Sequence, residues 1–155
     1  MSQSETLQPV RLDYSEKNRQ VVVCPKDNDM FVRSMEQIVE ACVVHERTLQ
    51  RAFRFKDQLD GLLKKLAQWL LDNKHRVHKA FLAPHEGGLR FLIIKIGARY
   101  DGDLEDSLTD LDIAVATSPE FDLLQLEVLC LPEVSMEAAH SFLPLSQVLE
   151  FSRGN

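Results

Sequence analysis

The sequence predicts an α+β domain in which helical segments come first, a mainly antiparallel sheet follows, and a short helix closes the chain. Three observations favour this order. Apolar residues recur at helical spacing from Phe31 to Leu70, the period becomes extended after Asn73, and turns with Gly or Pro divide the second half into short segments. Helices followed by consecutive strands are typical of an α+β sandwich with helices over one face of a meander.

The length and composition suit one globular domain over residues 1–155. The chain has 155 residues, of which 45% are hydrophobic and 27% charged, within the ordinary range for folded proteins. Residues 1–10 are polar and lack the basic start and apolar core of a secretory signal, so we expect a flexible tail there.

A short strand and two helical segments are predicted next. Val21–Cys24 is a β-branched run closed by Pro25, which is typical of an edge strand. Two apolar stripes follow, and we expect two helices with a bend near Arg51–Asp57, because helices of more than about 40 residues are rare in small domains. One long rod ending near Asn73, paired with a second copy, stays open because the stripe continues in heptad-like steps. The stripes comprise Phe31, Met35, Ile38, Cys42, Leu49 and Phe53, then Phe55, Leu59, Leu62, Leu63, Leu66, Trp69 and Leu70.

The second half predicts four consecutive strands and a closing helix. The first two strands form a hairpin, because glycines occupy the turn between them. The third is expected from its alternation of apolar and polar residues, and Pro132 ends the fourth. These segments are Val77–Ala83, Phe91–Tyr100, Thr109–Thr117 and Phe121–Leu131, with a helix from Met136 to Phe142 capped by Ser135.

Charge and cysteine usage limit the partners that we expect. The net charge is −6, and the distribution is uneven: residues 1–80 hold 14 Lys/Arg against 11 Asp/Glu, whereas residues 81–155 hold 4 against 13. No concentrated basic face is present, which argues against nucleic acid, and no apolar run is long enough for a membrane span. Cys24, Cys42 and Cys130 match no metal-ligand spacing, so we expect buried, inert thiols and a cytoplasmic location.

Six acidic residues between positions 101 and 112 form the segment most able to carry chemistry. The simplest interpretation is a solvated connection followed by a strand whose exposed face carries Asp110 and Asp112. A calcium site is an alternative, because four carboxylates occupy EF-hand positions one, three, five and twelve, although Asp106 replaces the turn glycine. These four carboxylates are Asp101, Asp103, Glu105 and Asp112.

The same stretch resembles the signature of the polymerase-β-like nucleotidyltransferases. Ile96-Gly97 is followed, after a connection, by Asp110-Leu111-Asp112-Ile113, similar to the family's Gly-Gly or Gly-Ser strand end and its Asp-hydrophobic-Asp-hydrophobic strand, although Ala98 stands at the second small position. The resemblance implies that Asp110 and Asp112 hold Mg²⁺ against a nucleoside triphosphate, with Glu127 or Asp122 as the third carboxylate.

No complete catalytic constellation appears in the sequence, so we expect a non-catalytic binding or assembly domain without a cofactor. The amphipathic helical region over residues 31–71, or an open sheet edge, predicts a homodimer, and a different protein partner fits the same surfaces. The alternative is a divergent or inactive nucleotidyltransferase that uses Asp110, Asp112 and Glu127 with Mg²⁺.

Overall fold

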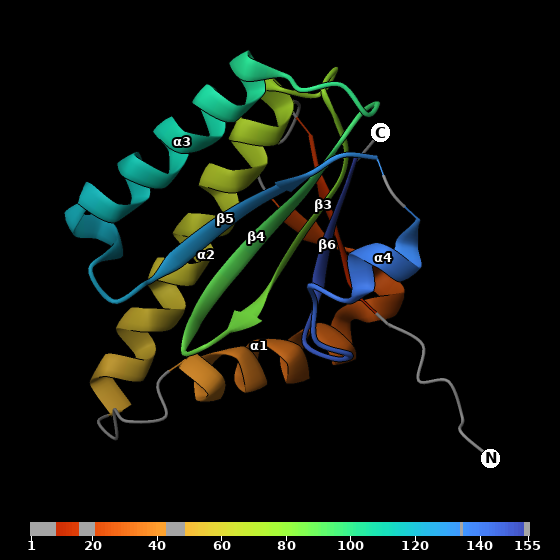
Figure 1. Cartoon of the computed structure of the whole chain (residues 1–155). Helices are drawn as coiled ribbons and strands as arrows, with labels where there is room; N and C mark the ends of the chain where they lie inside the picture. The colour runs from red at the N-terminus through yellow and green to blue at the C-terminus, as the bar shows by residue number, and fades with distance from the viewer. Residues whose placement is uncertain (1–8, 16–20, 43–48, 134, 154–155) are drawn as a thin grey trace.

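The computed structural model describes residues 9–15, 21–42, 49–133 and 135–153. The strands are β1 (Val10–Tyr14), β2 (Val21–Val23), β3 (Val77–His85), β4 (Gly88–Lys95), β5 (Leu126–Leu131) and β6 (Leu149–Arg153). The helices are α1 (Asn28–Cys42), α2 (Leu49–Asp72), α3 (Gly102–Thr117) and α4 (Met136–His140). Within these ranges the six strands form one sheet in the order β2-β1-β6-β3-β4-β5, and Figure 1 shows helices on both of its sides. The predicted α+β class is therefore correct.

The predicted antiparallel meander is wrong, because the sheet is mixed. Strand β3 pairs antiparallel with β4 and β6, and β2 pairs antiparallel with β1. However, β4 pairs parallel with β5, and β1 pairs parallel with β6. Parallel neighbours need a crossover connection, and α3 supplies it between β4 and β5. The strand predicted at Thr109–Thr117 is the second half of this helix.

The two faces of the sheet bury separate apolar clusters. Leu82, Phe91 and Ile93 point toward α1, α2 and α3 in the larger cluster, which also holds the buried side chains of those helices. The residues between them in the strands, such as Phe81 and Leu92, point to the other face and pack with α4. The helices are therefore divided between both faces, rather than gathered on one face as expected.

The hairpin between β3 and β4 confirms the turn predicted from its glycines. Glu86 and Gly87 form a two-residue loop, and both have positive φ angles, of 49° and 80°. A loop with positive φ at both positions matches the twist of antiparallel strands. The strands are continuous up to this loop, so Pro84 lies within β3 rather than in the turn.

The helical region confirms two helices and corrects their junction. Helix α2 is unbroken from Leu49 to Asp72, so the bend predicted near Arg51–Asp57 is wrong. Residues 43–48, which join α1 to α2, lie outside the described residues. In Figure 1 the two helices run in clearly different directions, which excludes a single straight rod.

The remaining predictions are corrected at their boundaries. Val21–Val23 is an edge strand, and Ser135 caps α4 by accepting a hydrogen bond from the Ala138 amide at 3.3 Å, both as expected. The predicted fourth strand is extended only from Leu126, because a 3-10 turn over Pro119–Phe121 precedes it.

Two strands, β1 and β6, were not predicted. The expected tail over residues 1–10 lies outside the described residues except for its last two positions. There, Val10 opens β1 and is 1% exposed, so the ordered chain includes it.

Candidate functional site

The acidic segment folds as a helix, because its apolar residues follow a helical period. Leu104, Leu108, Leu111 and Val115 are all buried and lie three to four residues apart. Asp101 starts the helix as its N-cap, with Oδ1 accepting a hydrogen bond from the Leu104 amide at 3.1 Å. The alternation of apolar and polar residues that suggested a strand extends over only a few positions. The helical spacing of the buried residues extends from Leu104 to Val115, so the segment folds as a helix.

Helix α3 separates the two carboxylates that the nucleotidyltransferase resemblance requires. Residues two apart on a helix point in directions about 200° apart, whereas on a strand they share one face. Accordingly, Asp110 is exposed and Asp112 is half-buried. The same helix includes Asp103 and Glu105, so an EF-hand loop does not form either.

The third carboxylates lie elsewhere. Glu127 is on β5 and contacts Arg90 on the sheet face that carries α4, whereas α3 covers the opposite face. Asp122 accepts hydrogen bonds from Gln58 at 2.6 Å and from Arg54, and these contacts lower the pKa of Asp122. Among the described residues no three His, Cys, Asp or Glu side chains are grouped as metal ligands.

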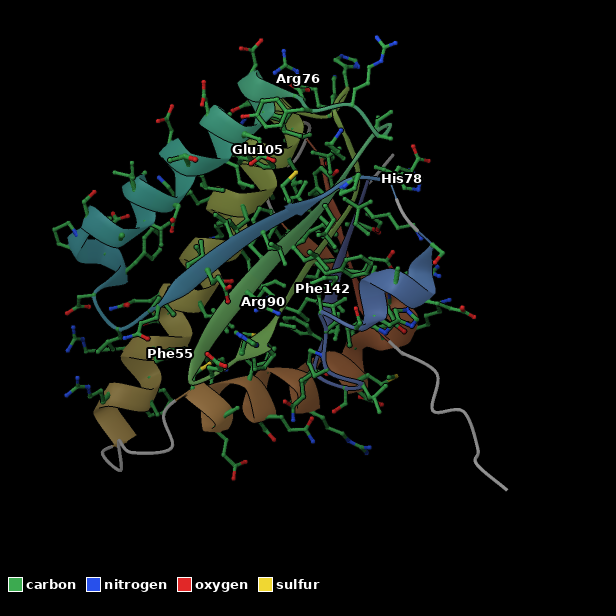
Figure 2. The ribbon with its side chains drawn as sticks, viewed as in Figure 1. Phe55, Arg76, His78, Arg90, Glu105 and Phe142 are labelled. Atoms are coloured by element: carbon green, nitrogen blue, oxygen red, sulfur yellow. The ribbon has the colours of Figure 1, made fainter. Side chains whose placement is uncertain are left out.

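Arg90 is the centre of a polar network that the sequence did not reveal. Its guanidinium donates to both carboxylate oxygens of Glu127 at 3.2–3.3 Å, to His85 Nε2 at 2.8 Å and to the Phe142 carbonyl at 3.1 Å. Figure 2 shows Arg90 on β4 with Phe142 nearby, on the α4 side of the sheet. The guanidinium donors are engaged with protein groups, and the network joins β4 and β5 to the segment after α4.

A second polar cluster closes the carboxyl end of β4. Lys95 is 5% exposed, and its Nζ donates to the Gly97 carbonyl at 3.3 Å. Arg76, which Figure 2 labels near the start of α3, forms ion pairs of 3.7 Å with Asp101 and Asp103. These charges fix the N-terminal end of α3 against the sheet.

Cys130 lies next to this cluster and is chemically quiet at neutral pH. Burial, together with the charge and hydrogen bond of Glu105, raises the pKa of the Cys130 thiol to about 11, although Lys95 acts in the opposite direction. Burial alone raises the pKa of Cys42 to about 11. Both thiols therefore remain protonated at neutral pH. All three cysteines are half-buried, rather than buried as predicted.

An apolar groove lies between α1 and α2. Its volume is about 560 Å³, and the two helices that line it run in different directions in Figure 1. Two of its side chains are markedly exposed, Val32 at 57% and Phe53 at 60%. The apolar lining comprises Phe31, Val32, Met35 and Val39 from α1, and Ala52 and Phe53 from α2.

The groove uses residues that the sequence assigned to the core stripe. Phe31, Met35 and Phe53 have the spacing of a buried face, and only Met35 is buried. Helix α1 has a second apolar row, Val32 and Val39, which lines the groove, and Val39 also packs against the larger cluster. This second row was the available sequence signal, because a single sheet-facing stripe does not need it.

No protein-family model, curated protein or solved structure matches the chain. In the part of the chain that the structure describes, none of the helices combines the length and apolarity needed to cross a bilayer.

Proposed function

We propose that the chain is a non-catalytic binding and assembly domain whose binding surface is the groove between α1 and α2. The observation that carries this proposal is the exposure of Val32 and Phe53 in a groove of about 560 Å³. Exposing large apolar side chains to water costs free energy, which is recovered when a ligand or partner covers them. Contiguous apolar patches on a domain surface are typical of binding sites.

The polar clusters support a binding role over a catalytic one. Arg90 and Glu127 hold the α4 side together, and Arg76 with Asp101 fixes the start of α3. The groove itself is lined mainly by apolar side chains with carboxylates at its margin, and such a lining favours recognition by burial.

We further propose that the domain assembles as a homodimer through the β5 edge. Strand β5 pairs with β4 on one side and is the terminal strand of the sheet that the described residues form, so no described strand pairs with its other backbone row. Antiparallel pairing of two copies about Val128 sets Leu126 opposite Cys130 and Glu127 opposite Leu129 of the second copy, so no like charges lie directly opposite each other.

A cytoplasmic location belongs to the same proposal. All three cysteines of the chain are free thiols, which is the state that a reducing compartment maintains.

The test of the groove uses Nile red, a neutral dye whose emission increases in apolar surroundings. We expect the native chain to enhance this emission and the Phe53→Glu variant to lose the enhancement, since the charge enters the apolar lining. Ile113→Glu is the matched control, because Ile113 is 55% exposed on α3, outside the groove. Circular dichroism should show the same helical content for all three proteins. Equal dye emission from all of them would refute the groove as the binding surface.

A further inference from the structure

The walls of the α1–α2 groove have the dimensions of a helix-binding site. The lining residues span positions 31–40 on α1 and 52–60 on α2. At a rise of 1.5 Å per residue each wall is about 12–14 Å long, which corresponds to between two and three helical turns. An amphipathic helix placed between two helices buries its apolar face in such a groove and keeps its polar face in water.

The rim of the groove is acidic. Glu36 and Glu40 lie on the α1 side, and Asp57 and Asp60 lie on the α2 side, and all four are exposed. Among the described residues of the lining, Lys56 is the one cationic side chain. In the described ranges, Asp60 alone of these four carboxylates has an ion pair, with Lys64 at 3.6 Å. The margin therefore attracts cationic side chains that flank an apolar stripe.

This charge distribution decides between the possible occupants. A second copy that docks by the same groove brings an identical acidic rim, because a two-fold interface places the same patch on both sides. Like charges facing each other at an interface oppose association. A neutral apolar compound leaves the rim charges without a role. A helix with lysine or arginine beside its apolar stripe satisfies both the apolar lining and the rim.

The geometry points to a cationic amphipathic helix of a partner protein as the occupant of the α1–α2 groove. This inference rests on the proposed function of the groove and adds the chemistry of the partner. The apolar stripe of that helix covers Val32 and Phe53, and its flanking cations lie near Glu36 and Asp57. The β5 edge stays available for the second copy, so a dimer would hold two such helices.

Fluorescence anisotropy with designed peptides and the full chain tests the inference. The probe is a labelled helical peptide of about 18 residues, or five turns, with leucine at positions i, i+3, i+4 and i+7 and lysine on the flanks. The second peptide replaces lysine with glutamate, and the third scrambles the lysine peptide so that the stripe is lost but the charge is kept. We expect the lysine peptide to bind at least about tenfold more tightly than either of the others.

Variants of the chain locate the binding. Phe53→Glu should lower the affinity of the chain for the lysine peptide at least about tenfold. The double change Glu36→Lys with Asp57→Lys should make the chain bind the glutamate peptide more tightly than the lysine peptide. Ile113→Glu and Asp110→Lys, which change the exposed surface of α3, should leave the affinity for the lysine peptide unchanged.

The outcomes separate this inference from the proposed function. Equal binding of the lysine and scrambled peptides, or binding that Phe53→Glu does not alter, would overturn the inference. A dimer that dissociates in Phe53→Glu would also overturn it, because the second copy would then occupy the groove. If Nile red still reports the groove in either case, the proposed binding surface stands without this partner. If dye and peptide are both insensitive to Phe53→Glu, the proposed function fails as well.

Discussion

Gly88 shows how one backbone position joins two strands. It begins β4 directly after the β3–β4 turn, and a Cβ atom at this position would lie 2.6 Å from the carbonyl oxygen of Gln125. The next residue, Leu89, donates its amide to that same oxygen at 2.8 Å. Only a glycine allows this approach, so the pairing of β4 with the start of β5 depends on the missing side chain.

The first prediction compares two Gly→Ala substitutions of opposite sign. Gly88→Ala should destabilise the fold by about 1–3 kcal/mol, the usual cost of overpacking, since the conflicting atom belongs to the backbone. Gly61→Ala should stabilise α2 by up to about 1 kcal/mol from helix propensity. The alanine Cβ would lie 3.5 Å from a Phe121 ring carbon, an ordinary contact. Urea unfolding measures the change in the free energy of unfolding for each variant. Two changes of the same sign would contradict the prediction.

The second prediction follows from the raised pKa values of Cys42 and Cys130, both about 11 against an ordinary value of 9.0. Only the thiolate form of cysteine reacts with iodoacetamide, and the raised pKa lowers the fraction of thiolate at pH 8. Alkylation at pH 8 should therefore be roughly 100-fold slower in the folded chain than in the unfolded chain. The rate should rise with pH until about pH 11. The same shift means that folding favours the protonated thiols, so their contribution to stability is complete below pH 9 and declines toward pH 11.

Mass spectrometry of the alkylated peptides follows each cysteine separately, with the urea-unfolded chain as the reference. Alkylation of either thiol at the unfolded rate at pH 8 would show that it is not buried as described.

At the scale of elements, α2 is the helix around which the larger cluster is built. Leu59, Leu62, Leu66 and Leu70 are each at most 1% exposed. Trp69 adds a polar contact, because its indole Nε1 donates to Ser107 Oγ at 3.0 Å and thereby joins α2 to α3. The stripe predicted from the sequence is thus the buried face of α2.

The third prediction measures that burial. Leu66→Ala should cost about 2–5 kcal/mol, because it removes a fully buried side chain and leaves a cavity. Lys64→Ala, two residues earlier on the exposed side of α2, should change stability by no more than about 0.5 kcal/mol. Chemical unfolding at equilibrium gives both values. A small effect of Leu66→Ala would mean that α2 does not pack on the sheet as described.

The elements divide clearly into those that the sequence predicts and those that it does not. The stripe of α2 and the β3–β4 hairpin were predicted, because each depends on residues close together in the chain. The α3 segment was misassigned, because Leu111, Ile113 and Val115 alternate over five residues while the helical period extends from Leu104.

Strands β1 and β6 were missed for a different reason. Each has an alternating pattern of only five residues, and the two strands pair with each other across more than 130 positions, which no local pattern reveals. The sequence predicted the groove only in part, since it marks Phe53 as an apolar position. The exposure of Phe53 depends on how α1 and α2 diverge, which the sequence does not show.

At the scale of the whole molecule, the open β5 edge should determine the assembly. The fourth prediction is that light scattering at micromolar concentration gives about twice the chain mass of 17.7 kDa. A Val128→Cys variant should form a covalent dimer on mild oxidation, because the two-fold pairing places this position opposite its own copy. Ile113→Cys on α3 is the matched control and should stay uncrosslinked. A mass of one chain at these concentrations would exclude the homodimer.

The place of β6 in the sheet has a consequence for how the protein is made. Strand β6 is the last of the six to leave the ribosome, yet it lies between β1, the first, and β3. The hairpin of β3 and β4 with α3 and β5 can assemble while translation continues, whereas the paired strands β1 and β2 cannot join the rest of the sheet until β6 emerges. During synthesis, the edge of β1 that pairs with β6 is therefore exposed until β6 emerges. We expect a chaperone to be needed during this interval.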